Sequence, residues 1–379
     1  SFLGLFTNLT IVKLIGGLTT LSALIRDIFQ KKKIDFFLTS QSLCFLILTC
    51  YVILTGFIKP GSNTRETFTK FGSFIMFYYL LVSLVDNYSR IRIIVWSCIS
   101  AMVWASFLAL AQFVFKGGGD ARPGALFGDS NYFAISLLVV ISMAYYRIEG
   151  EYKKRFKVLA VIFILILISG LMLTLSRGGI LGFLVGIIAV SLKKQEKWKG
   201  ILFLIIIINS TLLLMPQTFW KRVEMTKIRN TAVSDKYNEA FVSTERRIKL
   251  AKGALAMFIS NPIIGVGPGN FFWNSRQYAH IVPGMAHNMY LEVLAEMGMI
   301  GFPLFISIIF FTLKDLKYII ANSILNGSPN MKNLADSLQV GLISFLVSGV
   351  FLHAEYEKFF WLSIFLTLIL KKKMQESEI

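Results

Sequence analysis

The residues with the clearest capacity for chemistry lie between His287 and Glu292, followed one helical turn later by Glu296. A helix is expected to begin here, and because a helix N-terminus disfavours the imidazolium, His287 should be neutral and able to accept a proton. Asn288, Glu292 and Glu296 recur at i, i+4 and i+8, so they would share one helix face. Polar groups entering a membrane helix usually face the bundle interior or a cavity. The stripe indicates either a network that anchors the helix or a catalytic site, and we favour the catalytic site. In that site His287 would be the base, and Asn288, Tyr290 and Glu292 would contact the substrate.

Two further histidines are weaker candidates. His353 lies close to Glu355 and Glu357 in a short polar connection, which makes it a second candidate for the base or for substrate contact. His280 has no candidate partner nearby in the sequence, and we expect it on the surface.

The segment 173–179 joins two apolar runs through a very short turn that contains Ser176 and Arg177. Ser176 can cap the second helix, whose free N–H groups and dipole then favour an anion. A guanidinium beside them can hold phosphate oxygens bidentately. Gly178 and Gly179 would allow a ligand to approach the backbone. The alternative is an interfacial arginine that snorkels to the membrane surface.

The stretch from Pro216 to Ala286 is long and polar, and it carries ten Lys and Arg against four Asp and Glu. Within it, Thr244 could cap a basic amphipathic helix from Glu245 to Ile259. That helix either lies on anionic lipid headgroups or brings a second arginine, Arg246 or Arg247, to the same anion. Loops of this length are more often functional or disordered than idle. A basic loop that delivers a histidine and carboxylates to a membrane surface indicates chemistry on an anionic, lipid-linked substrate.

Two other loop segments suggest structure more than chemistry. The glycine-rich stretch 261–271 lacks a βαβ context and is interrupted by Pro268, so it predicts a turn-rich connection and not a nucleotide site. Asp129, Ser130 or Asn131 could cap the helix that follows. Arg122, just before them, could add a third positive group to the site.

The elements that must position these residues are membrane helices. The chain has 379 residues, of which 55% are hydrophobic, and apolar runs of about 18 or more residues recur along it. We therefore expect an all-α polytopic membrane protein in which the whole chain, 1–379, forms one integral membrane domain and the loop 216–286 is inserted in it. The eleven predicted spans are 10–28, 36–58, 67–85, 91–115, 130–146, 156–175, 178–192, 199–215, 288–320, 332–352 and 357–370.

Positive charge assigns the two sides of the membrane. Clusters of Lys and Arg occur in alternate connections, which we predict to be cytoplasmic, so the other connections and the loop 216–286 face outward. This assignment places Ser1 outside. Because the chain does not begin with Met, we expect one preceding helix and twelve spans in the full protein.

Composition and motifs exclude several classes of protein. The net charge of +18 comes without a nucleic-acid-binding motif, so nucleic acid is not an expected partner. The three cysteines lie in apolar runs and resemble buried hydrophobes. No metal-binding spacing or phosphate loop is present, and we expect neither a metal nor another cofactor. A transporter of the same lipid is a rival, although its ionisable groups would be expected nearer the bilayer midplane.

Taken together, these segments resemble the O-antigen ligase and polymerase family of bacterial envelope glycosyltransferases. The resemblance is strong over roughly residues 120–310. It rests on the stretches 128–134, 175–179, 247–255, 261–271, 287–292, 296–298 and 300–301. Ala251 departs from the pattern, since family members often carry an aromatic residue there, which leaves open whether Arg246 replaces Arg247.

The resemblance implies a fold of the GT-C type and inverting, metal-independent transfer of a glycan. The donor would be a glycan linked to undecaprenyl diphosphate, and the acceptor would be lipid A–core in a ligase or another glycan repeat unit in a polymerase. Arg177 and Arg247 would hold the diphosphate and His287 would be the base. The site would lie on the outer face of the bacterial inner membrane, among the membrane lipids.

Overall fold

The computed structural model describes residues 11–30, 39–115, 127–150, 153–193 and 235–377. In this part of the chain every regular element is helical. Arg122 and the predicted span 199–215 lie outside the described residues, as do parts of the loop before Asp235.

Ten of the predicted spans coincide with described helices, although their ends differ by several residues. These are α2 (Ile11–Phe29), α3 (Ser40–Ile58), α4 (Thr64–Leu84), α5 (Tyr88–Phe115), α6 (Ser130–Gly150), α7 (Lys154–Leu173), α8 (Arg177–Lys193), α13 (Met289–Leu325), α14 (Pro329–Ser348) and α15 (Lys358–Ser377). Six of them, α3 to α7 and α13, have the length and hydropathy of a membrane span. The chain is a multi-pass membrane protein.

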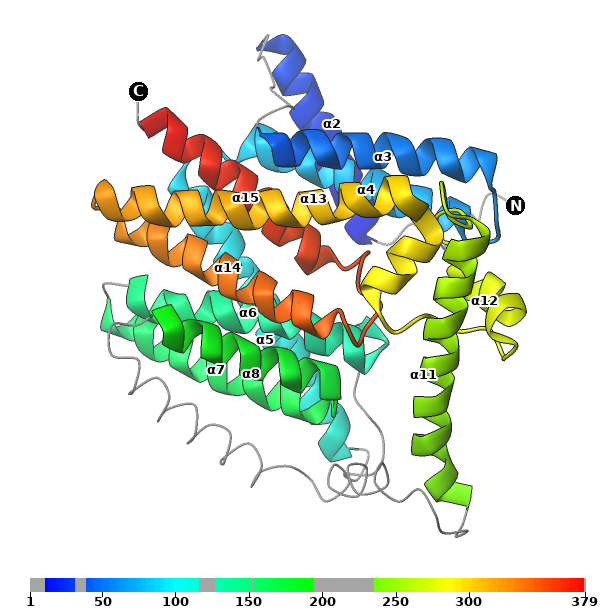
Figure 1. The fold of residues 1–379 in the computed structure, drawn as a ribbon. Coiled ribbons are helices and arrows are strands. Elements are labelled where there is room, and N and C mark those ends of the chain that lie inside the picture. Colours follow the sequence, from blue (N-terminus) through cyan, green and yellow to red (C-terminus); the bar gives the residue numbers. More distant parts are fainter. Residues whose placement is uncertain (1–10, 31–38, 116–126, 151–152, 194–234, 378–379) are drawn as a thin grey trace.

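The bundle is built around α6, α13, α14 and α15. Helix α14 packs against α6, α8 and α13, and α13 in turn packs against α3 and α15 (Figure 1). Its centre is aromatic: Trp361 of α15 is fully buried among Phe45, Phe74 and Phe365, with ring centroids 5.1–6.0 Å away. Such aromatic packing fixes the lateral positions of the helices.

Two helices of the polar loop close one end of the bundle. Helix α11 (Asp235–Ser260) packs against α13 and against the short helix α12 (Phe271–Ala279), and it crosses the ends of the bundle helices in Figure 1. Leu250, Ala254 and Met257 are its buried face. The predicted loop helix is therefore present, but it begins at Asp235, so the prediction that Thr244 caps it is wrong: Thr244 lies inside the helix.

A kink in α13 fastens the loop to the bundle. Gly298 is left-handed (φ 63°), and the break leaves carbonyl groups of the preceding turn without helical partners. The turn-rich connection supplies hydrogen-bond donors for these carbonyl groups. Val266 N–H donates to the carbonyl of Ala295 (2.9 Å), and Gly267 N–H donates to that of Glu296 (3.0 Å). The segment 261–271 is thus the ordered connection that the sequence predicts.

The opposite end of the bundle is held by ion pairs of buried carboxylates. Asp336 pairs with Lys193 and, at 2.8 Å, with Lys332. Asp315 pairs with Lys371 at 2.7 Å. Lys193 and Lys371 lie in the clusters that predict the cytoplasmic side, so the structure separates these clusters from the end that α11 covers.

Candidate functional site

The candidate site lies where several helix ends meet beneath α11. Helices α6, α8, α13 and α15 begin there (Figure 1). Residues at helix N-termini keep unpaired backbone N–H groups, so this end of the bundle has the polarity that favours an anion. The side chains of Ser176 and Asn288 cap the starts of α8 and α13, and these caps determine where Arg177 and His287 stand.

Ser176 sets the start of α8, as the sequence predicts. Its hydroxyl accepts a hydrogen bond from the Gly179 N–H (3.3 Å) and donates one to Asn131 Oδ1 (2.9 Å) on α6. The side chain is 2% exposed. With both partners in place, Ser176 positions Arg177, the first residue of α8, whose side chain is exposed. Direct contact of Ser176 with substrate stays a prediction.

The two glycines after Arg177 serve packing and not ligand approach, so that part of the sequence interpretation is wrong. A Cβ on Gly178 would lie 3.1 Å from Cβ of Phe351, and one on Gly179 would lie 2.7 Å from Cβ of Ala134. Both positions are buried between helices, which leaves the ligand-binding capacity of this turn to Arg177 and to the start of the helix.

Arg247 faces Arg177 across the site. Burial, with the nearby Arg177 guanidinium second, lowers the pKa of Arg247 below its ordinary value, although an arginine remains cationic. Its Nε is buried without a hydrogen-bond partner. Among the described residues, neither arginine has an ion-pair partner. Two adjacent cations without an ion-pair partner in the described part of the chain are the arrangement that an anionic ligand would stabilise.

Arg246 is placed differently. Its Nη2 donates to the carbonyl oxygen of Pro283 (2.9 Å), which ties α11 to the segment leading to His287. This geometry favours Arg247 over Arg246 as the partner of Arg177, a choice that the sequence left open. Contact of Arg246 with substrate stays a prediction.

His287 stands directly before α13 in a left-handed conformation (φ 50°). Burial, with the Arg247 guanidinium second, lowers its pKa to about 4, so the imidazole is neutral at physiological pH. Its Nδ1 has no hydrogen-bond partner in the described structure. The ring is therefore available as a proton acceptor, as the sequence predicts, but desolvation and the arginine contribute more than the sequence could show.

The polar stripe after His287 forms the framework that holds this residue. Asn288 Oδ1 caps α13 by accepting from the N–H groups of Tyr290 and Leu291, both at 3.0 Å. The Tyr290 hydroxyl donates to the Leu346 carbonyl (2.9 Å). Glu292 Oε2 accepts from the Ala286 N–H (3.0 Å), which fixes the backbone on the other side of His287.

Glu296 completes the framework one turn later. Its carboxylate accepts from the N–H groups of Gly269 (2.8 Å) and Phe271 (2.9 Å) and from the Tyr356 hydroxyl (3.0 Å). The stripe is thus an anchoring network that also places a neutral histidine. Direct substrate contacts of Asn288, Tyr290 and Glu292 stay predictions.

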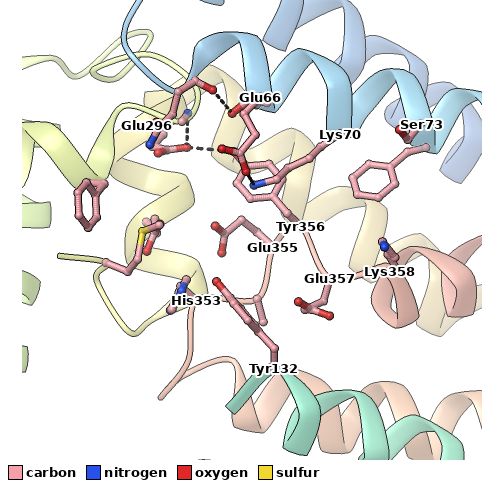
Figure 2. Close-up of a pocket in the computed structure, with 18 of the residues that line it drawn as sticks. Glu66, Lys70, Ser73, Tyr132, Glu296, His353, Glu355, Tyr356, Glu357 and Lys358 are labelled. Atoms are coloured by element: carbon pink, nitrogen blue, oxygen red, sulfur yellow. Dashed lines mark hydrogen bonds and ion pairs between the residues drawn. The ribbon is translucent and has the colours of Figure 1, made fainter. Parts of the chain in front are cut away.

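A pocket of about 390 Å³ lies beside His353 (Figure 2). His353, which the sequence offers as a second candidate, lines this pocket, and its ring centroid lies 5.4 Å from that of His287. Burial, with His287 second, lowers the pKa of His353 to about 3. The pocket also brings in side chains from other helices, among them Lys70 of α4 and Tyr132 of α6, which converge only through helix packing.

The arrangement separates two environments on either side of the histidines. Arg177 and Arg247 are on one side, and a carboxylate-lined pocket is on the other. The described residues hold no group of three or more His, Cys, Asp or Glu side chains that could bind a metal ion. The site can therefore hold an anionic group, accept a proton and seat a second, non-anionic molecule.

Comparison with known families gives a match for part of the chain. Residues 161–306 match the family model described as O-antigen ligase. A comparison with curated proteins gives no match. The matched segment runs from α7 into α13 and contains Arg177, Arg247 and His287. It confirms the family resemblance that the sequence motifs indicate.

Proposed function

From the O-antigen ligase domain carried by this chain, we propose that the protein transfers a glycan from undecaprenyl diphosphate to an acceptor hydroxyl at the outer face of the bacterial inner membrane. The domain assigns it to the enzymes of polysaccharide assembly. The observation that supports the specific reaction best is the pair Arg177 and Arg247, which have no ion-pair partner among the residues that the structure describes, beside the neutral imidazole of His287.

The diphosphate of the donor fits the arginine side of the site. Guanidinium groups hold phosphate oxygens through paired hydrogen bonds. The start of α8 adds a positive helix end beside Arg177. Because the leaving diphosphate gains negative charge as the glycosidic bond breaks, groups that are already positioned around it stabilise the transition state more than the ground state.

The transfer is a single displacement with inversion. The acceptor oxygen attacks the anomeric carbon from the face opposite the diphosphate, and the new C–O bond forms as the bond from that carbon to the diphosphate oxygen breaks. The electron pair leaves with undecaprenyl diphosphate, and the acceptor hydroxyl proton passes to a ring nitrogen of His287. General-base assistance of this kind contributes typically ~10²–10⁴-fold.

The loop helices would contribute position and exclusion of water. Helix α11 carries Arg247 and packs on α13, so the cation and the base are held by elements in direct contact. Holding donor and acceptor in reactive geometry replaces an unfavourable encounter in solution. The apolar bundle below offers its lipid-facing surface to the polyprenyl tail.

The proposal also concerns the identity of the acceptor. Lipid A–core is the acceptor if the enzyme is a ligase, which is the assignment we place first, and a second repeat unit is the acceptor if it is a polymerase. Purified protein in lipid nanodiscs, given a lipid-linked donor and each acceptor in turn, distinguishes them. A single capped product indicates a ligase, and a ladder of longer chains indicates a polymerase.

A negative result in this assay can distinguish an enzyme from a transporter. If no glycan is transferred to either acceptor while the protein moves the lipid-linked donor across a vesicle bilayer, the enzymatic assignment is wrong and the protein is a transporter of that lipid. The charged groups that would favour a transporter lie near the bilayer midplane. Here Arg177, Arg247 and His287 gather at one end of the bundle.

A further inference from the structure

The pocket beside His353 has no role yet in the donor chemistry, and its composition is the reverse of the arginine side. Five glutamates line it against two lysines. The glutamates are Glu66, Glu292, Glu296, Glu355 and Glu357. Carboxyl oxygens act mainly as hydrogen-bond acceptors and outnumber the positive groups of this lining, so it offers a diphosphate few donors. Whatever binds there is therefore not the anionic group of the donor.

One carboxyl group in this pocket has an oxygen that is available to a ligand. Glu355 is 4% exposed, lines the pocket, and has a buried Oε2 with no hydrogen-bond partner among the described residues. Figure 2 shows its carboxyl group pointing into the pocket near His353. A buried oxygen left unpaired is destabilising, so a ligand that donates a hydrogen bond to it would recover that free energy.

The neighbouring carboxyl groups, by contrast, already form hydrogen bonds or ion pairs within the protein. Glu296 accepts three hydrogen bonds, and Glu292 accepts one from the Ala286 N–H. Glu66 pairs with Lys70 at 2.9 Å, and Lys70 lies over the Tyr356 ring. Glu355 and, less deeply, Glu357 are therefore the groups that remain for a ligand; the Ser136 hydroxyl contact to Glu357 is long, at 3.3 Å.

The state of these two carboxyls matches a polyhydroxylated partner. Burial raises the pKa of Glu355 to about 8 and that of Glu357 to about 7. Burial disfavours the ionised form of both carboxyls, and each keeps an oxygen that can accept a hydrogen bond from a sugar hydroxyl. The rings of Phe74, Tyr132 and Phe272 also line the pocket and offer flat apolar faces. Small-ligand sites typically combine such rings with a few polar groups in ~300–1,000 Å³.

We propose that this pocket binds the acceptor as the terminal residue of a non-anionic sugar, either neutral or amino-substituted, whose hydroxyl or ammonium hydrogens meet Glu355 and Glu357. The inference rests on the proposed function and extends it to the acceptor. His353 lines this pocket and its ring centroid lies 5.4 Å from that of His287, so the pocket lies one ring away from the base, while the diphosphate occupies the arginines.

The test uses the full-length protein in nanodiscs and three trisaccharides that differ in charge: maltotriose, the fully deacetylated chitosan trimer and trigalacturonate. Saturation-transfer NMR titrations should detect maltotriose and the chitosan trimer but not trigalacturonate. Glu355→Gln, which replaces one carboxyl oxygen by an NH2 donor, should weaken binding of both ligands about 10-fold, the scale of one lost hydrogen bond. Asp86→Asn, at an exposed ion pair with Arg90, should leave binding unchanged.

The proposal is overturned if none of the three sugars binds, if trigalacturonate binds as well as maltotriose, or if Glu355→Gln binds like the unmodified protein with its melting temperature preserved. Titration of inorganic pyrophosphate against Arg247→Gln separates this result from the proposed function. Pyrophosphate binding that depends on Arg247, with sugar binding indifferent to Glu355, removes only the acceptor pocket. Sugar binding that depends on Glu355, with pyrophosphate binding indifferent to Arg247, keeps the acceptor pocket and removes the donor assignment.

Discussion

The imidazole rings of His287 and His353 meet edge to face with their centroids 5.4 Å apart, although one precedes α13 and the other precedes α15. Both have a buried Nδ1 without a partner in the described structure. Protonation of either ring would place a cation against the other and near Arg247, so the pair can store at most one proton. This contact joins the arginine side of the site to the carboxylate pocket.

The role of His287 as base predicts a selective loss of chemistry. His287→Asn keeps a residue that tolerates the left-handed backbone but removes the proton acceptor. We expect glycan transfer to fall ~10²–10⁴-fold with the donor KM little changed, measured with lipid-linked donor in nanodiscs. His280→Asn is the matched control, since His280 is also left-handed (φ 52°) and is exposed. Equal activity in both variants would remove His287 from the mechanism.

The lowered pKa of His287 predicts the pH dependence of the reaction. The base must be unprotonated, so kcat/KM should stay level as pH falls through 6.5 and drop only as pH approaches about 4. Arg247→Gln removes a nearby positive charge, which makes protonation of the ring easier and should move this acidic limb upward. A limb near 6.5 in the unmodified enzyme, or no shift in the variant, would show that another group is titrating.

The arginines should divide into two groups by their effect on the donor. Arg177→Gln and Arg247→Gln each leave one cation where the structure places two, and we expect kcat/KM for the donor to fall ~10²-fold or more. Arg246→Gln loses a hydrogen bond to the Pro283 carbonyl and should act more mildly, mainly on stability. Steady-state kinetics together with thermal melting separates the two effects. If Arg246→Gln abolishes donor use and Arg247→Gln does not, the two have been assigned in reverse.

The fastening of the loop at the α13 kink predicts a stability effect at Gly265. Its φ is +69°, and a Cβ there would lie 2.3 Å from the carbonyl carbon of Glu296. Gly265→Ala should therefore destabilise the loop attachment by about 1–3 kcal/mol and lower transfer activity. Gly72→Ala is the control, because nothing lies within 4 Å of its Cβ and the position is helical. Both are read from the melting temperature in nanodiscs; equal melting temperatures would contradict the tight contact.

Much of the architecture follows from the sequence because its determinants are local. Hydropathy and length define ten of the described helices, and short-range capping defines the turns at Ser176 and Asn288. The loop helix is also evident from its pattern. Its start is not, because the segment before Thr244 continues as helix where no sequence signal requires it.

The remaining features depend on contacts between distant segments. Gly178 and Gly179 look like an opening for a ligand, yet their neighbours are Phe351, between α14 and α15, and Ala134 on α6. The choice between Arg246 and Arg247 depends on which side chain reaches the Pro283 carbonyl. The sequence marks His353 as a candidate, but the pocket beside it forms only where α4, α6, α13 and the segment before α15 converge.

The position of the donor diphosphate tests the account most directly. A cryo-EM structure of the protein in nanodiscs with a non-transferable undecaprenyl diphosphate analogue should show the phosphates between Arg177 and Arg247, with the anomeric carbon facing His287. Phosphate density in the pocket lined by Glu355, or at the opposite end of the bundle beside Lys193 and Lys332, would contradict it.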